Sequence, residues 1–283
     1  MQIERMVVIG AGTMGTGIAQ TAAQAGLSVT VIDTDEAALE RSQERLGKSL
    51  RGAVEREKLT AEQAEQARAL IAWTMRWDAV AQADLVLEAV FEDLEAKRAV
   101  LARAGELAPP NAVLASNTST LPISRLAEMS GRPDRFLGMH FFNPAPVMKL
   151  VEVIPGARTL PQVTEAALAL CERMGKEPKL APDIPGFLVN RGFGALLAAA
   201  IDIWLHGAKP AEIDAAMELG LGHKMGPLAT ADLIGLDVCL ALLESLHAQT
   251  GHARFEVAPE LRAMVQAGKL GRKSGEGFYV YEQ

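Results

Sequence analysis

The segment GAGTMG at residues 10–15 constrains the fold of this 283-residue chain more than any other feature. It follows the apolar run MVVIG (6–10) and precedes GIAQTAAQA, which is typical of a helix. In a strand–turn–helix unit, glycines at the first, third and sixth positions allow a tight turn, close approach of a diphosphate and close packing of helix on strand. The motif therefore predicts a dinucleotide-binding turn. Its predicted cofactor contacts are Gly10, Ala11, Gly12, Thr13, Met14 and Gly15.

An acidic residue further along the chain distinguishes this motif from a glycine turn with only a structural role. The next apolar run, SVTVID (28–33), ends in Asp33, 18 residues past Gly15. This is close to the spacing expected of a carboxylate that binds the ribose hydroxyls of the adenosine. The carboxylate would also repel a 2′-phosphate, and no arginine follows it directly. The sequence therefore predicts NAD rather than NADP as the cofactor.

Short β-rich runs alternate with helical segments through the first half of the chain. This alternation is typical of an α/β fold with a doubly wound, mostly parallel sheet of the Rossmann type. Strands are expected at residues 6–10, 28–33, 84–89, 112–116 and 136–142, and a long charged helix at 38–57.

The pattern changes at APDIPGFLVNR (181–191), where two prolines and a glycine interrupt it. We therefore predict an NAD-binding domain over residues 1–183 and an all-helical domain for substrate binding and dimerisation over residues 184–283. An apolar helical domain of this size often hides part of its surface against a second copy, so a homodimer is expected. In this domain helices are expected at 187–207, 210–219 and 229–250, and a strand signal returns only in FYVYE at 278–282.

Composition excludes several classes of function. A net charge of -7 argues against a nucleic-acid or anionic-membrane partner, since both favour basic surfaces. No apolar run approaches the roughly 18 residues of a membrane span, and the N-terminus lacks the pattern of a signal peptide, so a cytoplasmic protein is expected. Cys171 and Cys239 form no motif and are expected to be buried, reduced thiols.

Two ionisable residues lie in the apolar stretch GMHFFNPAPVMKLVEVIPG (138–156). His140 and Glu152 are symmetric about Pro146. In a hairpin centred there they would be direct cross-strand neighbours, with Cβ atoms about 5 Å apart. The carboxylate could then accept a proton from one imidazole nitrogen and leave the other as a base. The alternative is a histidine satisfied in the core and an unrelated glutamate; a metal site is not predicted, because no third ligand has suitable spacing.

The predicted cofactor favours the catalytic interpretation of this pair. An oxidoreductase that binds NAD needs a base to take the proton of an alcohol as hydride leaves. His140 lies on a late strand of the nucleotide-binding half, and the carboxyl ends of such strands face the cofactor crevice.

Six segments together resemble the short-chain L-3-hydroxyacyl-CoA dehydrogenases, especially the bacterial 3-hydroxybutyryl-CoA dehydrogenases. They span residues 7 to 281, nearly the whole chain, and HFFNPAPVMKLVEV is the most specific among them. The resemblance implies NAD-dependent oxidation of an L-3-hydroxyacyl-CoA to the 3-oxoacyl-CoA, and the reverse. The segments are VIGAGTMGTGIAQ, LASNTSTL, GMHFFNPAPVMKLVEV, PGFLVNR, IDAAMELGLGHKMGPLATADLIGLD and GRKSGEGFYVY.

The resemblance also implies roles for individual residues. His140 would be the general base, Glu152 its orienting partner, and Ser119 and Asn190 would hold the substrate oxygen. From the residues alone, Ser119 could instead end a strand and Asn190 could cap a helix. The further contacts that the resemblance implies are Glu92, Lys97, Asn143 and Lys273 for NAD, and Ser49 and Arg56 for the CoA moiety.

Alternatives remain for several of these residues. Glu92 would be favoured at a helix start in any case, and Lys97 could be a solvated surface residue. Where relatives carry clustered lysines, this chain has Gly52, Glu55 and Glu57, which predicts a weaker electrostatic hold on the CoA phosphates. ALLAAAIDI (195–203) also departs from the Asn-Glu pair of many relatives. The alternative functions are a dehydrogenase of a free 3-hydroxy (sugar) acid and a non-catalytic NAD-binding protein.

Overall fold

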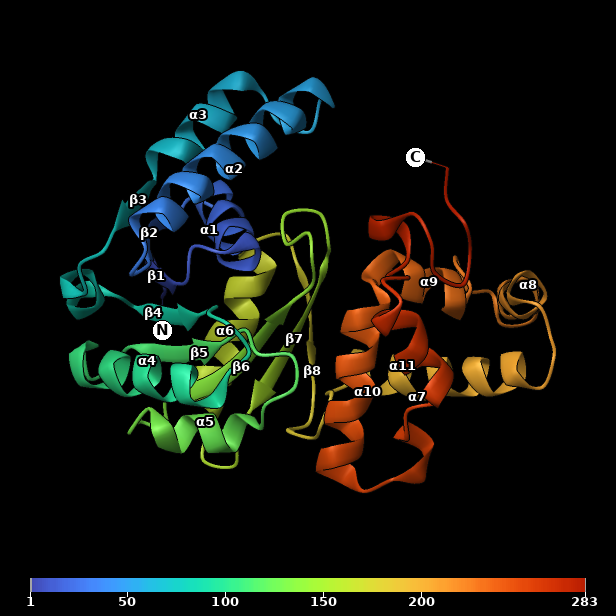
Figure 1. Ribbon diagram of the computed structural model, residues 1–283. Coiled ribbons are helices and arrows are strands. Elements are labelled where there is room, and N and C mark those ends of the chain that lie inside the picture. The colour runs from blue at the N-terminus through green and yellow to red at the C-terminus, as the bar shows by residue number, and fades with distance from the viewer. Residues whose placement is uncertain (1, 283) are drawn as a thin grey trace. The chain divides into compact units, whose positions relative to one another are not determined.

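The computed structural model describes residues 2–282, which divide into two compact units, one ending at Asp183 and the other beginning at Ile184 (Figure 1). The first unit is an α/β sheet with flanking helices and the second is helical. The predicted fold class is therefore confirmed.

The first unit is built on one eight-stranded sheet with the order β3-β2-β1-β4-β5-β6-β7-β8. All neighbouring strands are parallel except β6 and β7, which are antiparallel. The strands are β1 (Arg5–Ile9), β2 (Ser28–Ile32), β3 (Ile71–Thr74), β4 (Leu85–Glu88), β5 (Val113–Ser116), β6 (Phe136–Phe141), β7 (Leu150–Pro155) and β8 (Glu177–Leu180).

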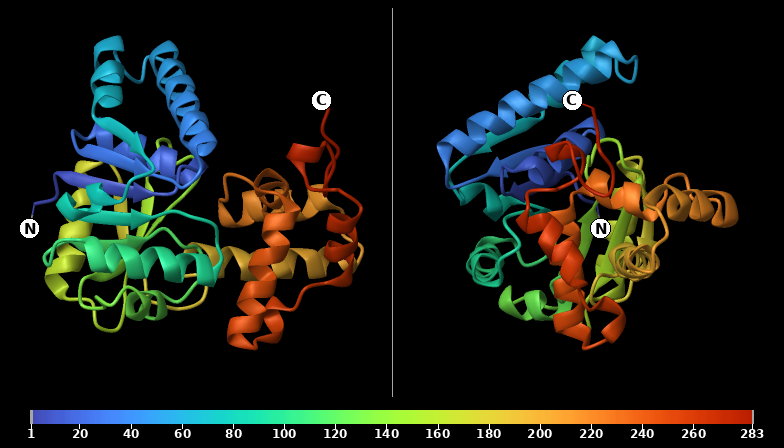
Figure 2. Two further views of the ribbon diagram at one scale, coloured as in Figure 1. Left: turned by 60° about the vertical axis from the view of Figure 1, so that its left-hand side comes forward. Right: turned by 45° about the vertical axis from the view of Figure 1, so that its right-hand side comes forward.

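Helices cover both faces of this sheet. Side chains of α1 and α6 share a core with alternate strand residues such as Val8, Leu87 and Met139. Helices α4 and α5 pack against each other and against β4 and β6, and Figure 2 shows α2 and α3 projecting beyond the sheet. The helices are α1 (Thr13–Gln24), α2 (Glu36–Glu55), α3 (Ala61–Ala69), α4 (Leu94–Leu107), α5 (Ile123–Met129) and α6 (Pro161–Arg173), with a 3₁₀ turn, η1, at Asp78–Gln82.

The five strands expected in the first half are present as β1, β2, β4, β5 and β6, each within about two residues of its expected bounds. Two edge strands, β3 and β8, were not expected. The sequence of β8 is EPKL, in which charged residues and proline obscure a strand pattern but suit the edge of a sheet. The long charged helix is α2, which begins two residues early because the Asp35 carboxylate caps it by accepting from the backbone N–H of Ala37 at 3.0 Å.

The antiparallel pair β6–β7 has the register expected from the symmetry about Pro146. His140 lies directly opposite Glu152 in the ladder. The connecting turn is held by the ammonium of the buried residue Lys176, which donates to the carbonyls of Ala145 at 2.6 Å and Met148 at 2.9 Å. The hairpin is therefore fixed both by its ladder and by its turn.

The second unit packs its helices around their own apolar core. One long helix was expected at 229–250, but the structure has two helices separated at Gly235, whose φ of +111° ends the first. The helices are α7 (Val189–Leu205), α8 (Pro210–Leu221), α9 (Pro227–Ile234), α10 (Leu236–Thr250) and α11 (Pro259–Gln266), with 3₁₀ turns η2 (Ala253–Phe255) and η3 (Arg272–Ser274).

The strand expected at 278–282 is wrong. Within the described part of the chain this segment makes a single isolated bridge, between Val280 and Glu276. The physical reason is a buried carboxylate: Asp232 accepts from the backbone N–H groups of Phe278 and Tyr279, both at 3.0 Å. These donors are therefore used by a side chain instead of a neighbouring strand.

Both cysteines are free and buried. Among residues 2–282, no helix is long and apolar enough to cross a membrane. The same residues contain no cluster of side chains suited to hold a metal ion.

Candidate active site

The glycine turn between β1 and α1 leaves an open cradle at a helix N-terminus. A Cβ on Gly15 would lie 1.8 Å from the carbonyl oxygen of Gly10, so only glycine allows this close packing. A Cβ on Gly12 would instead meet nothing within 4 Å, and no side chain caps the helix that begins after it. The start of α1 thus has no side-chain cap and has open space beside Gly12, which fits the diphosphate of a dinucleotide.

Asp33 lies beside this cradle, directly after β2. Its carboxylate accepts from the backbone N–H of Ala11 at 2.8 Å and from that of Asp35 at 3.1 Å. The side chain is half-buried and so still reaches solvent. A negative charge held at this point fits ribose hydroxyls and opposes a 2′-phosphate.

His140 and Glu152 form a buried hydrogen-bonded pair in the β6–β7 hairpin. Nδ1 of His140 lies 2.7 Å from Oε2 of Glu152, and the residues are 4% and 0% exposed. Because an ionised carboxylate can only accept, Nδ1 carries the proton of this bond. The other ring nitrogen, Nε2, is then the atom at which the imidazole can take up or release a proton.

Ser119 brings a hydroxyl to that second nitrogen. It lies in the loop after β5, and its Oγ is 3.1 Å from Nε2 of His140. The loop is also tied to β6 by Asn117, whose Oδ1 accepts from the backbone N–H of Phe141 at 2.9 Å. Thus three of the four residues implied as catalytic lie together: Ser119, His140 and Glu152.

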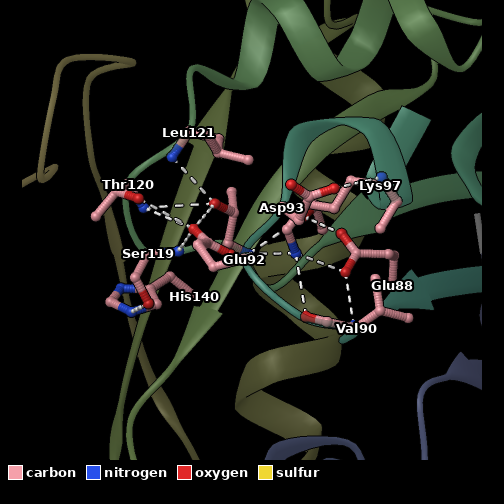
Figure 3. Close-up of polar contacts among 12 residues, drawn as sticks. Glu88, Val90, Glu92, Asp93, Lys97, Ser119, Thr120, Leu121 and His140 are labelled. Atoms are coloured by element: carbon pink, nitrogen blue, oxygen red, sulfur yellow. Dashed lines mark hydrogen bonds and ion pairs between the residues drawn. The ribbon is translucent and has the colours of Figure 1, made fainter. Parts of the chain in front are cut away.

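An ion cluster built on the buried residues Glu88 and Lys97 supports the loop that carries Ser119 (Figure 3). The Lys97 ammonium lies 2.6 Å from Glu88 and 3.2 Å from Glu92. Partial burial opposes ionisation of Glu92, whose side chain is 39% exposed, but Lys97 and hydrogen bonds from Thr118 and the backbone of Ser119 outweigh it, so the pKa of Glu92 lies below its ordinary value. Lys97 is 1% exposed, so the alternative of a solvated surface lysine is wrong.

Sequence reasoning missed Glu88, Ser116 and Thr118, which complete this cluster. The Glu88 carboxylate accepts from the Ser116 hydroxyl at 2.6 Å, and the Thr118 hydroxyl donates to Glu92. One signal was available: Glu88 is a carboxylate at the end of the apolar strand DLVLEA, as His140 and Glu152 are ionisable groups in apolar strands.

The remaining implied residues lie in several elements. Asn143 is exposed in the turn after β6, while Ser49 and Arg56 lie on α2 and at its C-terminal end. Asn190 lies in the first turn of α7, one residue past its first, and so is not its N-cap. Lys273, in η3, donates to Asp237 at 2.5 Å. Asn190 and Lys273 belong to the second unit, and their roles stay predictions.

Comparison with known families decides the identity of this architecture. Residues 5–184 match the model for the 3-hydroxyacyl-CoA dehydrogenase NAD binding domain, and residues 186–281 match that for the 3-hydroxyacyl-CoA dehydrogenase C-terminal domain. The chain belongs to the 3-hydroxyacyl-CoA dehydrogenase family. The resemblance drawn from the sequence is thereby confirmed.

Relatives match this 3-hydroxyacyl-CoA dehydrogenase over its full length. A probable 3-hydroxybutyryl-CoA dehydrogenase of Bacillus subtilis is 44% identical, covering 100% of this chain and 99% of its own. One from Deinococcus radiodurans is 46% identical, covering 97% and 99%. The crystal structure of (S)-3-hydroxybutyryl-CoA dehydrogenase from Ralstonia eutropha superposes with a TM-score of 0.95 at 41% identity, covering 100% of both chains.

Membership also confirms the predicted enzyme class and cofactor. The protein is an NAD-dependent oxidoreductase of the 3-hydroxyacyl-CoA dehydrogenase type. The open glycine cradle and the carboxylate of Asp33 are the features of its own structure that fit NAD.

Proposed function

We propose that this 3-hydroxyacyl-CoA dehydrogenase converts L-3-hydroxybutyryl-CoA to acetoacetyl-CoA, and the reverse, with a His–Glu pair as general base and acid. The observation that carries the proposal is the buried 2.7 Å contact between His140 and Glu152, with Ser119 at the other ring nitrogen. The short acyl chain is suggested by the relatives from Bacillus subtilis and Ralstonia eutropha, which are named for 3-hydroxybutyryl-CoA.

In oxidation, Nε2 of His140 takes the proton of the substrate hydroxyl. Glu152, 2.7 Å from Nδ1, stabilises the imidazolium that results. The hydroxyl of Ser119 donates a hydrogen bond to the substrate oxygen without taking its proton, and the family resemblance implies the same role for the amide of Asn190. NAD, when bound, supplies the acceptor for the hydride. In reduction, the imidazolium returns its proton to the nascent alkoxide.

The cofactor contacts proposed for this chain centre on the glycine cradle. Asp33 binds the ribose hydroxyls next to Ala11, and Glu92 lies at the carboxyl edge of the sheet with Lys97 behind it. Asn143 and Lys273 complete the proposed set. Because NAD and acyl-CoA are held inside cells, and the thiols Cys171 and Cys239 are free, we propose that the enzyme works in the cytoplasm.

A steady-state assay tests the proposed substrate. NADH oxidation is measured with acetoacetyl-CoA, with free acetoacetate and with free 3-oxo sugar acids at matched concentrations. Turnover of the CoA ester alone supports the proposal. Preference for a free acid would assign the enzyme to the alternative class, and binding of NADH without turnover of any substrate would leave a non-catalytic NAD-binding protein.

Cofactor choice is the first test of the cradle. Because Asp33 opposes a 2′-phosphate, we expect kcat/KM for NADH to exceed that for NADPH by at least about tenfold, on the order of 1.4 kcal/mol. Asp33→Ser should narrow this preference while Asp35→Ser, two residues on, should not. Equal use of the two cofactors by the unchanged enzyme would remove Asp33 from this role.

The CoA contact is tested on α2. Ser49 and Arg56 are seven residues apart and so share one face of the helix, with the Arg56 side chain folded over Gly52. We expect Arg56→Glu to raise KM for acetoacetyl-CoA several-fold more than KM for NADH, because it places like charge against the CoA phosphates. Arg51→Glu, about 140° away around the same helix, is the matched control. Equal changes in KM for acetoacetyl-CoA in the two variants would mean that this face of α2 is solvated and does not contact CoA.

The helical unit is also the proposed dimerisation domain. It exposes large apolar side chains on α8 and α9, among them Leu219 at 89%, Leu221 at 64% and Leu233 at 53%. Exposed apolar surface of this kind is usually covered by a partner. We expect sedimentation at micromolar concentration to give twice the mass of the chain. A monomer at that concentration would contradict the proposal.

A further inference from the structure

The ion pair between Glu88 on β4 and Lys97 on α4 is fully buried, although neither residue takes part in the proposed proton transfer. Glu88 is 0% and Lys97 1% exposed, and their charged atoms lie 2.6 Å apart. Taking two charges out of water is costly, and an apolar pair of similar volume often replaces such a bridge without loss of stability. A contribution to stability, by holding α4 on the sheet, therefore does not explain why this pair is buried.

The ammonium of Lys97 has acceptors for all three of its N–H donors. They are Oε1 of Glu88 at 2.6 Å, Oε2 of Glu92 at 3.2 Å and the carbonyl of Val90 at 3.4 Å. Figure 3 shows these acceptors gathered around the one nitrogen. With these acceptors around its ammonium and its side chain buried, Lys97 acts on the loop after β5 through Glu92.

Glu92 connects Lys97 to the loop after β5, because its two carboxylate oxygens contact one each. While its Oε2 faces Lys97, its Oε1 accepts from the backbone N–H groups of Ser119 at 3.0 Å and Thr120 at 3.2 Å. The hydroxyls of Thr118 and Thr120 donate to the same oxygen. Oε1 of Glu92 thus holds the three consecutive residues 118–120 by hydrogen bonds.

Glu88 holds the beginning of the same segment. Its Oε2 accepts from the hydroxyl of Ser116 at 2.6 Å, and the Ser116 oxygen in turn accepts from the backbone N–H of Thr118 at 3.2 Å. The segment 116–120 is therefore tied at both ends to carboxylates that a single ammonium bridges. Its outward hydroxyl is that of Ser119, 3.1 Å from Nε2 of His140.

We propose that Lys97 and Glu88 are positioning residues for catalysis, which hold segment 116–120 so that the Ser119 hydroxyl stays at the proton-accepting nitrogen of His140. This inference rests on the proposed function, because it assumes that Ser119 serves the reaction. Removing the ammonium leaves Glu88 and Glu92 with no cation between them, and their repulsion loosens the loop.

The test is a double-mutant cycle between Lys97→Met and Ser119→Ala, read as kcat for acetoacetyl-CoA reduction. Lys97→Met should lower kcat about tenfold in the wild-type background and less than about twofold in the Ser119→Ala background, because the loop position no longer matters without the hydroxyl. Arg98→Met is the matched control on the same helix, since Arg98 forms an exposed surface pair with Glu95, and it should leave kcat unchanged.

A second variant applies if Lys97→Met does not fold. Thr118→Val keeps the side-chain volume and removes the hydroxyl that donates to Glu92, and it should lower kcat several-fold in the wild-type but not in the Ser119→Ala background. Thr21→Val, a buried threonine that donates to a carbonyl of α1, is its control.

The outcomes separate this inference from the proposed function. If Ser119→Ala lowers kcat but Lys97→Met and Thr118→Val lower it by the same factor in both backgrounds, the ion cluster is structural and the inference is overturned. If Ser119→Ala leaves kcat unchanged, both the role of Ser119 and the inference fall. If the wild-type enzyme does not reduce acetoacetyl-CoA, the proposed function itself fails.

Discussion

Replacement of His140 by glutamine is expected to lower kcat for acetoacetyl-CoA reduction at least about a hundredfold, the usual scale for the loss of an acid–base residue. Glutamine keeps a polar side chain of similar length but cannot exchange a proton near neutral pH. The affinity for NADH, measured by fluorescence titration, should be unchanged, because the cradle and Asp33 follow β1 and β2, which β4 and β5 separate from β6 and His140 in the sheet.

An exposed histidine provides the matched control for this change. His206 has a side chain 78% exposed and contacts only its own helix through Asp202 in the described hydrogen bonds. We expect His206→Gln to leave kcat and KM unchanged. A His140→Gln enzyme that retains more than a tenth of wild-type turnover would mean that another group moves the proton.

Replacement of Glu152 by glutamine is the second large effect that we expect. The carboxylate is 0% exposed and contacts Nδ1 of His140, so the change removes the charge that stabilises the imidazolium while keeping the volume. Removing the orienting acid of such a pair costs turnover heavily because the imidazole also loses its correct tautomer. We expect kcat to fall by at least about tenfold, with NADH affinity retained.

The control for this change is an exposed glutamate on the neighbouring strand. Glu177 starts β8 and pairs with Lys149, with a side chain 62% exposed. Glu177→Gln removes the same charge from the same sheet, and we expect it to leave kcat unchanged. A Glu152→Gln enzyme as active as this control would reduce Glu152 to a partner that only fills space in the core.

Features encoded by local sequence were predictable. The glycine turn was predictable because the three glycines follow a strand and open a helix, and because Asp33 ends the next strand. The His140–Glu152 contact was predictable because a hairpin centred on Pro146 permits one register, and in an antiparallel ladder that register puts the two side chains on one face.

Features that depend on tertiary contacts were not predictable. The edge strand β8 is polar, and it is a strand only because β7 offers it a ladder. The segment 278–282 has the composition of a strand, yet Asp232, 46 residues earlier than Phe278, captures its backbone donors. Local pattern carries no information on either partner.

The ion cluster shows the same limit within the site. Lys97 looks like an ordinary charged residue of an amphipathic helix, and nothing in the segment LEAKRAVLARAGEL distinguishes it from Arg98. Only the packing of α4 on β4 makes one of them 1% exposed and leaves the other at the surface. Burial, rather than residue type, assigns Lys97 its role.

The double variant His140→Gln/Glu152→Gln tests the central claim, that these two residues act as one catalytic unit. Its kcat for acetoacetyl-CoA reduction is measured beside those of the two single variants and the wild type. Because the glutamate acts through the histidine, we expect the double variant to fall no more than about threefold below His140→Gln alone. Losses that multiply in full would contradict the claim, since they would mean that the carboxylate contributes to the reaction independently of the imidazole it contacts.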